Sequence, residues 1–326
     1  MQFLFRFALP IFAALFSLSA LAQSGPAPFP TKPVRIVVTF TTGGATDVIG
    51  RIVGQKLSEL WGQQVIIDNR PGAGGAVGTE LVAKAAPDGY TLVLSSFGPM
   101  AIAPFVYPKL AYDPVKDLVP ITLAATSWYF MVVNPSMPAK SVKEFIALAK
   151  AKPGEITYSS SGNASPTHLS GALFASAAGI TLSHVPYKGA APGIAAVVSG
   201  EVQMAIESPP PIVPQVKAGR LRAIAAARRD RSVLLPDVPT MAEAGLPGFE
   251  AGSWYGFHAP AGTPKPIIDK IHADMVKVMS LPDVRERFAS VGGDTIANTP
   301  AQYGAFVEAE LKKWGQVIKA TGIKVD

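Results

Sequence analysis

Residues 34–47 read VRIVVTFTTGGATD and contain, in order, a strand, a turn and the start of a helix. The run at 34–40 is rich in β-branched residues, which is typical of a buried strand. The two glycines that follow mark a tight turn, and Asp47 is a residue type that favours the first turn of a helix. Apolar residues then recur at three- and four-residue spacing from Ile49 to Leu60. The stretch therefore predicts a strand–turn–helix unit.

The same alternation of short apolar strands and amphipathic helices recurs along the rest of the chain. Further strands are expected at residues 65–67, 90–95, 156–159, 184–187, 202–206, 221–226 and 254–260, and the chain is expected to end in a pair of helices at 264–279 and 300–321. Such alternation predicts the α/β class, with parallel strands joined by right-handed crossovers.

The alternation starts twice, which predicts two lobes. Residues 30–126 and 254–326 are expected to form lobe 1, and residues 127–253 to form lobe 2. The chain would cross between them near 125–128 and near 254–257, and the two crossings would make a two-strand hinge. Two lobes on a hinge suit a protein that closes around a ligand.

The first 22 residues, MQFLFRFALPIFAALFSLSALA, are typical of a signal peptide. They combine one charge at Arg6, a short apolar core and a small-x-small end, which predicts cleavage after Ala22 and export to the periplasm. The alternative is a membrane anchor, but the apolar core is short for a span and Pro10 interrupts it.

The amino-acid composition limits which classes of protein and of functional site are possible. The chain has 326 residues, of which 48% are hydrophobic and 16% charged, so it can bury a large core. It has no cysteine, which excludes disulfides, iron–sulfur clusters and cysteine nucleophiles. The formal charge is +6, but the basic residues do not cluster with aromatic ones, so no nucleic-acid partner is expected. The uncharged stretches 89–108 and 118–139 are interrupted by prolines and favour buried strands over membrane spans.

Two strand-to-helix turns are the strongest candidates for a binding site. Residues 41–47 (TTGGATD) and 159–165 (SSSGNAS) both carry glycine and hydroxyl groups. Such turns offer free N–H groups at the positive end of a helix, and ligands of α/β sheets lie beyond the carboxyl ends of strands. One such turn could be only a helix cap. Two facing turns in two lobes predict an anion site.

The sequence gives little support for a nucleotide-binding, hydrolase or metal site. Residues 71–78 (PGAGGAVG) fail the dinucleotide pattern because Val77 stands where its last glycine is needed. The sequence contains no P-loop, no G-x-S-x-G and no S-x-x-K, and its four histidines lack metal-ligand spacing. We therefore expect no metal, no cofactor and no catalysis.

The sequence allows two roles for each of four further residues. His168 contacts the ligand or packs behind the second turn. Asp47 orients the first turn or contacts the ligand. Glu207, at a strand end, receives a polar or cationic ligand group or caps the loop, and Lys188 pairs with an anion or stays in solvent.

With these features in place, the chain resembles the substrate-binding proteins of tripartite tricarboxylate transporters, often called Bug proteins. The resemblance covers nearly the whole mature chain. It rests on GGATD (43–47), IDNRPGAGG (67–75), APDGYTL (86–92), AYDPVKDLVPI (111–121), KPGEITYSSSG (152–162), HVPYKGAAP (184–192), LPDVPTMAEAGLPGFE (235–250) and WYGFHAPAGTP (254–264).

The resemblance implies a type II periplasmic binding protein fold, with a mixed sheet in each lobe, and a ligand carboxylate held between the two turns. The matching positions are Thr41, Thr42, Gly43, Ala45, Thr46 and Asp47 in lobe 1 and Ser161, Gly162, Asn163, Ser165, Thr167 and His168 in lobe 2. Phe40, Ser96, Phe97 and Glu207 are expected to form the walls that set specificity. Thr42 stands where the family usually has proline, so the immediate cage of the ligand can differ from that of relatives.

The implied function is an exported solute-binding protein. It would capture a dicarboxylate, tricarboxylate, acidic amino acid or aromatic acid as a monomer, without a cofactor, and deliver it to a tripartite tricarboxylate-type membrane transporter. The alternatives are a periplasmic sensor that feeds a signalling protein and an enzyme acting on such acids. The lack of a recognisable nucleophile–base motif argues against the enzyme.

Overall fold

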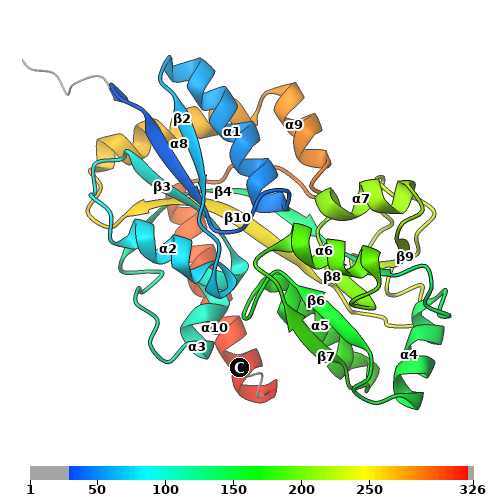
Figure 1. The fold of residues 1–326 in the computed structure, drawn as a ribbon. Helices are drawn as coiled ribbons and strands as arrows, with labels where there is room; N and C mark the ends of the chain where they lie inside the picture. The colour runs from blue at the N-terminus through cyan, green and yellow to red at the C-terminus, as the bar shows by residue number, and fades with distance from the viewer. Residues whose placement is uncertain (1–28, 322–326) are drawn as a thin grey trace, which may run out of the picture.

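The computed structural model describes residues 29–321. The predicted signal peptide, residues 1–22, lies outside the described residues. In the part of the chain that is described, no helix is long and apolar enough to cross a membrane. Figure 1 shows two α/β units side by side, each built on a sheet with helices around it.

The first sheet has five strands in the order β2-β1-β3-β10-β4. Their bounds are β1 Val34–Val38, β2 Val65–Asn69, β3 Thr91–Ser96, β4 Leu118–Trp128 and β10 Gly252–Pro260. β1 pairs in parallel with β2 and β3, whereas β10 runs antiparallel to β3 and β4. The sheet is therefore mixed rather than wholly parallel, because β10 returns from the second unit.

Helices cover both faces of the first sheet. One face carries α1 Ala45–Trp61, α8 Lys265–Met279 and α9 Pro282–Ala289. The other face carries α2 Ala76–Ala83, α3 Ala103–Val106 and α10 Pro300–Thr321. Two short turns complete the unit, a 3-10 turn η1 Ala73–Gly75 and a π-helical turn η2 Gly98–Ile102. Alternate residues of β1 supply the two cores: Ile36 packs with the α1 side, and Val37 with the α2 side. The period of two in a strand explains this division.

The second sheet has the order β7-β6-β8-β5-β9. Its strands are β5 Phe130–Val133, β6 Thr157–Ser160, β7 Ser183–Pro186, β8 Met204–Glu207 and β9 Arg222–Ala226, and its helices are α4 Val142–Ala151, α5 Pro166–Ala178, α6 Ala190–Ser199 and α7 Pro209–Lys217. β7, β6 and β8 are parallel, and β5 runs antiparallel to β8 and β9. α4 and α5 pack on one face, and α6 and α7 on the other.

Two neighbouring strands connect the sheets. β4 leads through Tyr129 into β5, and Ala251 leads into β10. The β4–β10 ladder extends to the pair Trp128 and Gly252, and beyond it the Tyr129 N–H donates to the Ala251 carbonyl at 3.0 Å. This antiparallel pair has the arrangement expected of a two-strand hinge. The exact lobe boundaries stay a prediction.

The structure differs from the sequence expectations in two segments. α9 lies between the two helices expected at the C-terminal end, and it begins with Pro282 and an acidic residue in its first turn, which are local signals of a helix start. Residues 98–106, expected as part of buried strands and turns, are helical in η2 and α3.

Candidate ligand-binding site

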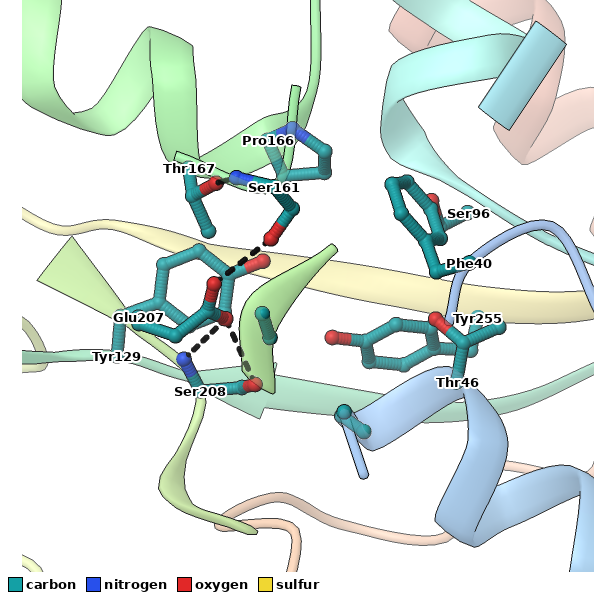
Figure 2. Close-up of a pocket in the computed structure, with 13 residues that line it drawn as sticks. Phe40, Thr46, Ser96, Tyr129, Ser161, Pro166, Thr167, Glu207, Ser208 and Tyr255 are labelled. Atoms are coloured by element: carbon teal, nitrogen blue, oxygen red, sulfur yellow. Dashed lines mark hydrogen bonds between the residues drawn. The ribbon is translucent and has the colours of Figure 1, made fainter. Parts of the chain in front are cut away.

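A cavity lies between the two units and takes residues from both (Figure 2). It encloses about 330 Å³, counting its open mouth. The lining residues are Phe40, Gly44, Ala45, Thr46, Ser96 and Tyr255 from the first unit, and Tyr129, Ser161, Pro166, Thr167, Ala190, Glu207 and Ser208 from the second unit and its connection.

Four helices begin at the wall of this cavity. α1, α5, α6 and α7 have the N-cap residues Gly44, Ser165, Gly189 and Ser208. The first N–H groups of a helix have no partner inside it, and an N-terminus with such groups carries roughly half a positive charge. α1, α5 and α6 offer these groups, whereas α7 begins with three prolines, which have no N–H. Gly44 and Gly189 have no side chain that could cap those groups, so they are left for a ligand. None of the 13 described lining residues is Lys, Arg or His, so helix ends and hydroxyl groups supply the attraction for an anion.

Strand order brings these helix ends together. β7, β6 and β8 are parallel neighbours, and α6, α5 and α7 each follow one of them. The carboxyl ends of parallel strands share one edge of a sheet, so the three helices start at that edge. α1 follows β1 of the first sheet, and its N-cap Gly44 lies next to Ala190, the first residue of α6.

Asp47 braces the first turn and does not line the cavity. Its Oδ2 accepts hydrogen bonds from the Gly43 N–H at 3.1 Å and from Arg51 Nε at 3.0 Å, and Oδ1 accepts one from Asn69 Nδ2 at 3.0 Å. Gly43 has φ of 90°, a left-handed conformation that favours glycine. Burial raises the pKa of Asp47, but the hydrogen bonds from Arg51, Gly43 and Asn69 outweigh it, so the pKa lies below its ordinary value.

Asp47→Asn is expected to lower the free energy of unfolding by about 1–2 kcal/mol at neutral pH, because it weakens charge-assisted hydrogen bonds that hold the turn. The pKa of Asp47 is lowered in the folded state, so its stabilisation is present above its ordinary pKa of about 4 and is lost as the pH falls through the folded value. The measurement is urea unfolding of both proteins at pH 7 and at about pH 3. If Asp47→Asn lowered the free energy of unfolding by the same amount at both pH values, the charge of Asp47 would not stabilise the turn.

Hydroxyl groups hold the second turn. Ser165 caps α5, with its Oγ accepting from the His168 N–H at 3.2 Å. Thr167 Oγ1 accepts from the Ser161 N–H at 2.8 Å and lies 3.1 Å from Ser165 Oγ. Gly162 takes φ of 125° between them. This network presents Ser161 and Thr167 to the cavity and keeps Ser165 behind it.

His168 packs behind the second turn. Its ring stacks on that of His184, with 3.9 Å between centroids and 6° between planes, and its Nδ1 accepts from the Ala164 N–H at 3.2 Å. Burial and the nearby His168 lower the pKa of His184 to about 3. Of the two interpretations of His168, the geometry supports packing.

Glu207 brings a carboxylate to the cavity wall at the end of β8, where it is only 5% exposed. Its Oε2 accepts from Ser161 Oγ at 2.7 Å, and its Oε1 accepts from the Ser208 N–H at 2.7 Å and from Ser208 Oγ at 2.8 Å. Burial raises its pKa, although these hydrogen bonds act in the opposite direction. Burial and the Glu207 charge raise the pKa of Tyr129 and Tyr255, so both hydroxyls are neutral donors near pH 7.

Ser96 offers a hydroxyl that lacks a partner. It lies at the end of β3, is 0% exposed, and its Oγ has no hydrogen bond among the described residues. A buried polar atom beside a cavity is the kind that a ligand or a water satisfies. The ring of Phe40 lies next to Ser96 in Figure 2 and gives this wall an apolar part. Phe97, expected in the same wall, instead packs against Trp314 at 4.7 Å between centroids.

Of the predicted binding residues, the cavity is lined by Phe40, Ala45, Thr46, Ser96, Ser161, Thr167 and Glu207. It is not lined by Thr41, Thr42, Gly43, Asp47, Gly162, Asn163, Ser165, His168 or Lys188. Lys188 and Thr42 are exposed, and several of the others brace the turns.

Gly44 lies in the predicted turn 41–47, whereas sequence reasoning missed Tyr129, Pro166, Ala190, Ser208 and Tyr255. Ala190 and Ser208 each begin a helix after a strand, which is the same signal that marked the two predicted turns. Tyr129 and Tyr255 had no such signal, because their places depend on long-range pairing: Tyr255 lies in the β4–β10 ladder, and the Tyr129 N–H donates to the Ala251 carbonyl beyond it.

Glycines form the contact between the two units next to the cavity. A Cβ atom at Gly74 would overlap the carbonyl oxygen of Asn163, and one at Gly98 would lie 3.0 Å from the carbonyl oxygen of Ala164. The Tyr107 hydroxyl donates to the same Asn163 carbonyl at 3.1 Å. The backbones of the two units therefore approach each other more closely than larger residues would allow.

Comparison with known proteins agrees with this geometry. Residues 49–323 match the model of the family described as "Tripartite tricarboxylate transporter family receptor". The chain belongs to this family. The Bug-type resemblance and the two-sheet α/β fold expected from the sequence are thus confirmed.

Individual members of the family are similar over most of their length. Protein BugT of Bordetella pertussis is 37% identical over 298 residues, which cover 91% of this chain and 91% of BugT. The structure of Rpa4515 of R. palustris with adipate superimposes with a TM-score of 0.88 at 35% identity, covering 91% of this chain and 99% of that one. MatC from Rhodopseudomonas palustris with bound malate gives a TM-score of 0.84 at 33% identity, covering 89% and 100%.

Proposed function

We propose that this chain is an exported solute-binding protein that captures a small organic carboxylate between its two lobes. The observation that carries the proposal is the convergence of the N-termini of α1, α5 and α6 on one cavity that contains no cationic side chain among its described lining residues. Free N–H groups and helix dipoles bind anions without a charged side chain. The carboxylates in the structures of Rpa4515 and MatC support the same ligand class.

The proposed partner is a membrane transporter of the tripartite tricarboxylate type, and the proposed compartment is the periplasm. The family description supports the partner. The signal-like first 22 residues support the compartment. A sensor would use the same cavity and differ only in its partner. Deleting the gene should abolish uptake of the radiolabelled ligand; uptake at the wild-type rate, with loss of a transcriptional response, would favour the sensor.

An enzyme acting on organic acids is the weaker candidate. The structure does contain a hydroxyl–imidazole pair that the sequence did not reveal, with Ser160 Oγ 2.6 Å from His184 Nε2. Ser160 is 2% exposed and does not line the cavity, so this pair cannot reach a ligand held there. Its geometry fits a bond that holds β6 to β7.

Carboxylates are expected to raise the melting temperature of the purified protein by several degrees. A ligand at a thousand times its Kd stabilises a folded protein by about 4 kcal/mol when it binds only that state. The measurement is a thermal-shift screen of mono-, di- and tricarboxylates with aliphatic, aromatic and amino-bearing members. Amines with the same carbon skeletons serve as controls and should give no shift.

The proposal would fail if no carboxylate shifted the melting temperature and none was found by native mass spectrometry of protein isolated from the periplasm. A shift with the amines instead would contradict an anion site.

A further inference from the structure

Glu207 places a carboxyl group in a cavity that is proposed to bind an anion. Its carboxylate lies at the wall, and its three hydrogen bonds come from only two residues, Ser161 and Ser208. No Lys, Arg or His forms an ion pair with it among the described residues. When Glu207 is ionised, its negative charge therefore belongs to the surface that a ligand meets.

The hydrogen bonds leave room for one more donor. A carboxylate has about four acceptor positions, two on each oxygen. Oε1 of Glu207 accepts two hydrogen bonds, and Oε2 accepts one, from Ser161 Oγ. One acceptor position of Oε2 is thus unfilled among the described residues. In Figure 2 this oxygen lies beside the side chain of Tyr129, on the wall that faces Thr46 and Phe40 across the cavity.

The net charge of the cavity also favours a ligand that carries a hydrogen-bond donor besides its carboxylate. The N-termini of α1, α5 and α6 at roughly half a charge each amount to about +1.5, since α7 begins with three prolines and adds no free N–H, and an ionised Glu207 reduces this to about +0.5. A ligand of net charge −1 is closer to balancing that value than a ligand of net charge −2. An unsubstituted dicarboxylate carries −2, and it has no donor for Oε2.

From this geometry we propose that Glu207 is a specificity-determining residue that selects carboxylates bearing a hydrogen-bond donor, an ammonium group or more weakly a hydroxyl, over carboxylates without one. The donor fills the open position of Oε2 while the ligand carboxylate occupies the helix N-termini. This inference rests on the proposed function, because it needs a carboxylate ligand in the cavity.

The competing arrangement is a protonated Glu207 that donates to a second ligand carboxylate. The three hydrogen bonds it accepts favour the ionised form, whereas its burial favours the protonated one. The two arrangements predict opposite results for Glu207→Gln. A neutral amide reproduces a protonated acid as a donor, but it cannot replace an ionised acceptor for an ammonium group.

The test uses ligands that differ in one substituent: butanedioate, hydroxybutanedioate and aminobutanedioate, together with hexanedioate and 2-aminohexanedioate. Their Kd values are measured by calorimetry for the wild type, for Glu207→Gln and for a matched control, Glu201→Gln. Glu201 is exposed outside the cavity, where its Oε1 accepts from the Tyr187 hydroxyl at 2.9 Å. The wild type and the control should bind the amino compounds about ten- to a hundredfold more tightly than the unsubstituted ones, with the hydroxy compound between them.

Glu207→Gln should reduce that preference to about threefold or less, because it weakens binding of the amino compounds and strengthens binding of the dicarboxylates. A wild-type preference for the unsubstituted acids, or an unchanged preference in Glu207→Gln, would overturn the inference and leave the proposed function standing. Failure of every carboxylate to bind the wild type would overturn both. The ligand preference of the wild type is measured without any variant, so the inference can be overturned even if Glu207→Gln fails to fold.

Discussion

Thr46→Asp is expected to weaken carboxylate binding by about a thousandfold. Thr46 lies in the first turn of α1, is 4% exposed and lines the cavity. A carboxylate there stands where the ligand carboxylate is proposed to bind. Two like charges about 4 Å apart repel by about 4 kcal/mol at an effective dielectric constant of about 20, which corresponds to that loss. The fold should survive, because an acidic residue in the first turn of a helix is favourable.

Thr46→Asn is the matched control, since asparagine has nearly the size of aspartate and no charge. It should bind within about tenfold of the wild type, and calorimetry on both variants separates charge from shape. Equal affinities of the Asp and Asn variants would place the ligand carboxylate elsewhere. Ser161 is a poorer position for this test, because its hydroxyl donates to Glu207 at 2.7 Å and a carboxylate there would also disturb the empty cavity.

Gly74→Ala is expected to weaken ligand binding by roughly ten- to a hundredfold. A Cβ at this position overlaps the carbonyl oxygen of Asn163 across the contact between the two units. Relieving such an overlap costs about 1–3 kcal/mol, and the lobes can avoid it by staying apart. A ligand that contacts both lobes then binds more weakly, because bringing the lobes together costs this free energy. Calorimetry gives the affinity, and small-angle scattering should show a larger radius of gyration than the wild type at saturating ligand.

Gly62→Ala is the control for backbone strain. Gly62 has φ of 62° and Gly74 has φ of 60°, but a Cβ at Gly62 has nothing within 4 Å. Both variants should lose stability because alanine is strained at that φ, and only Gly74→Ala should lose affinity. If both kept the affinity of the wild type, the contact at Asn163 would not belong to the bound state.

Local features of the fold could be predicted from the sequence. The β-branched run at 34–40 forms β1, and the turn after it leads into α1. The two turns chosen as an anion site do border the cavity. Each of these depends on residues within a few positions of one another.

The roles of single residues within those turns could not be predicted. Asp47 and His168 belong to the expected motifs, yet neither lines the cavity, and both hold the turns in shape. Which side chain of a turn faces a ligand depends on what packs behind it, here Asn69 for Asp47 and His184 for His168. Those partners lie on other strands, so the motif does not specify them.

The sequence by itself determined where strands end and helices begin, because β propensity, glycine turns and helix caps act over short stretches of chain. Only the tertiary structure decided which helix ends meet. Four N-termini share one cavity because β7, β6 and β8 are parallel neighbours in one sheet and β1 lies in the other, joined through the β4–β10 pair. Strand order depends on contacts between distant residues, and it brings ordinary helix starts together at a single cavity.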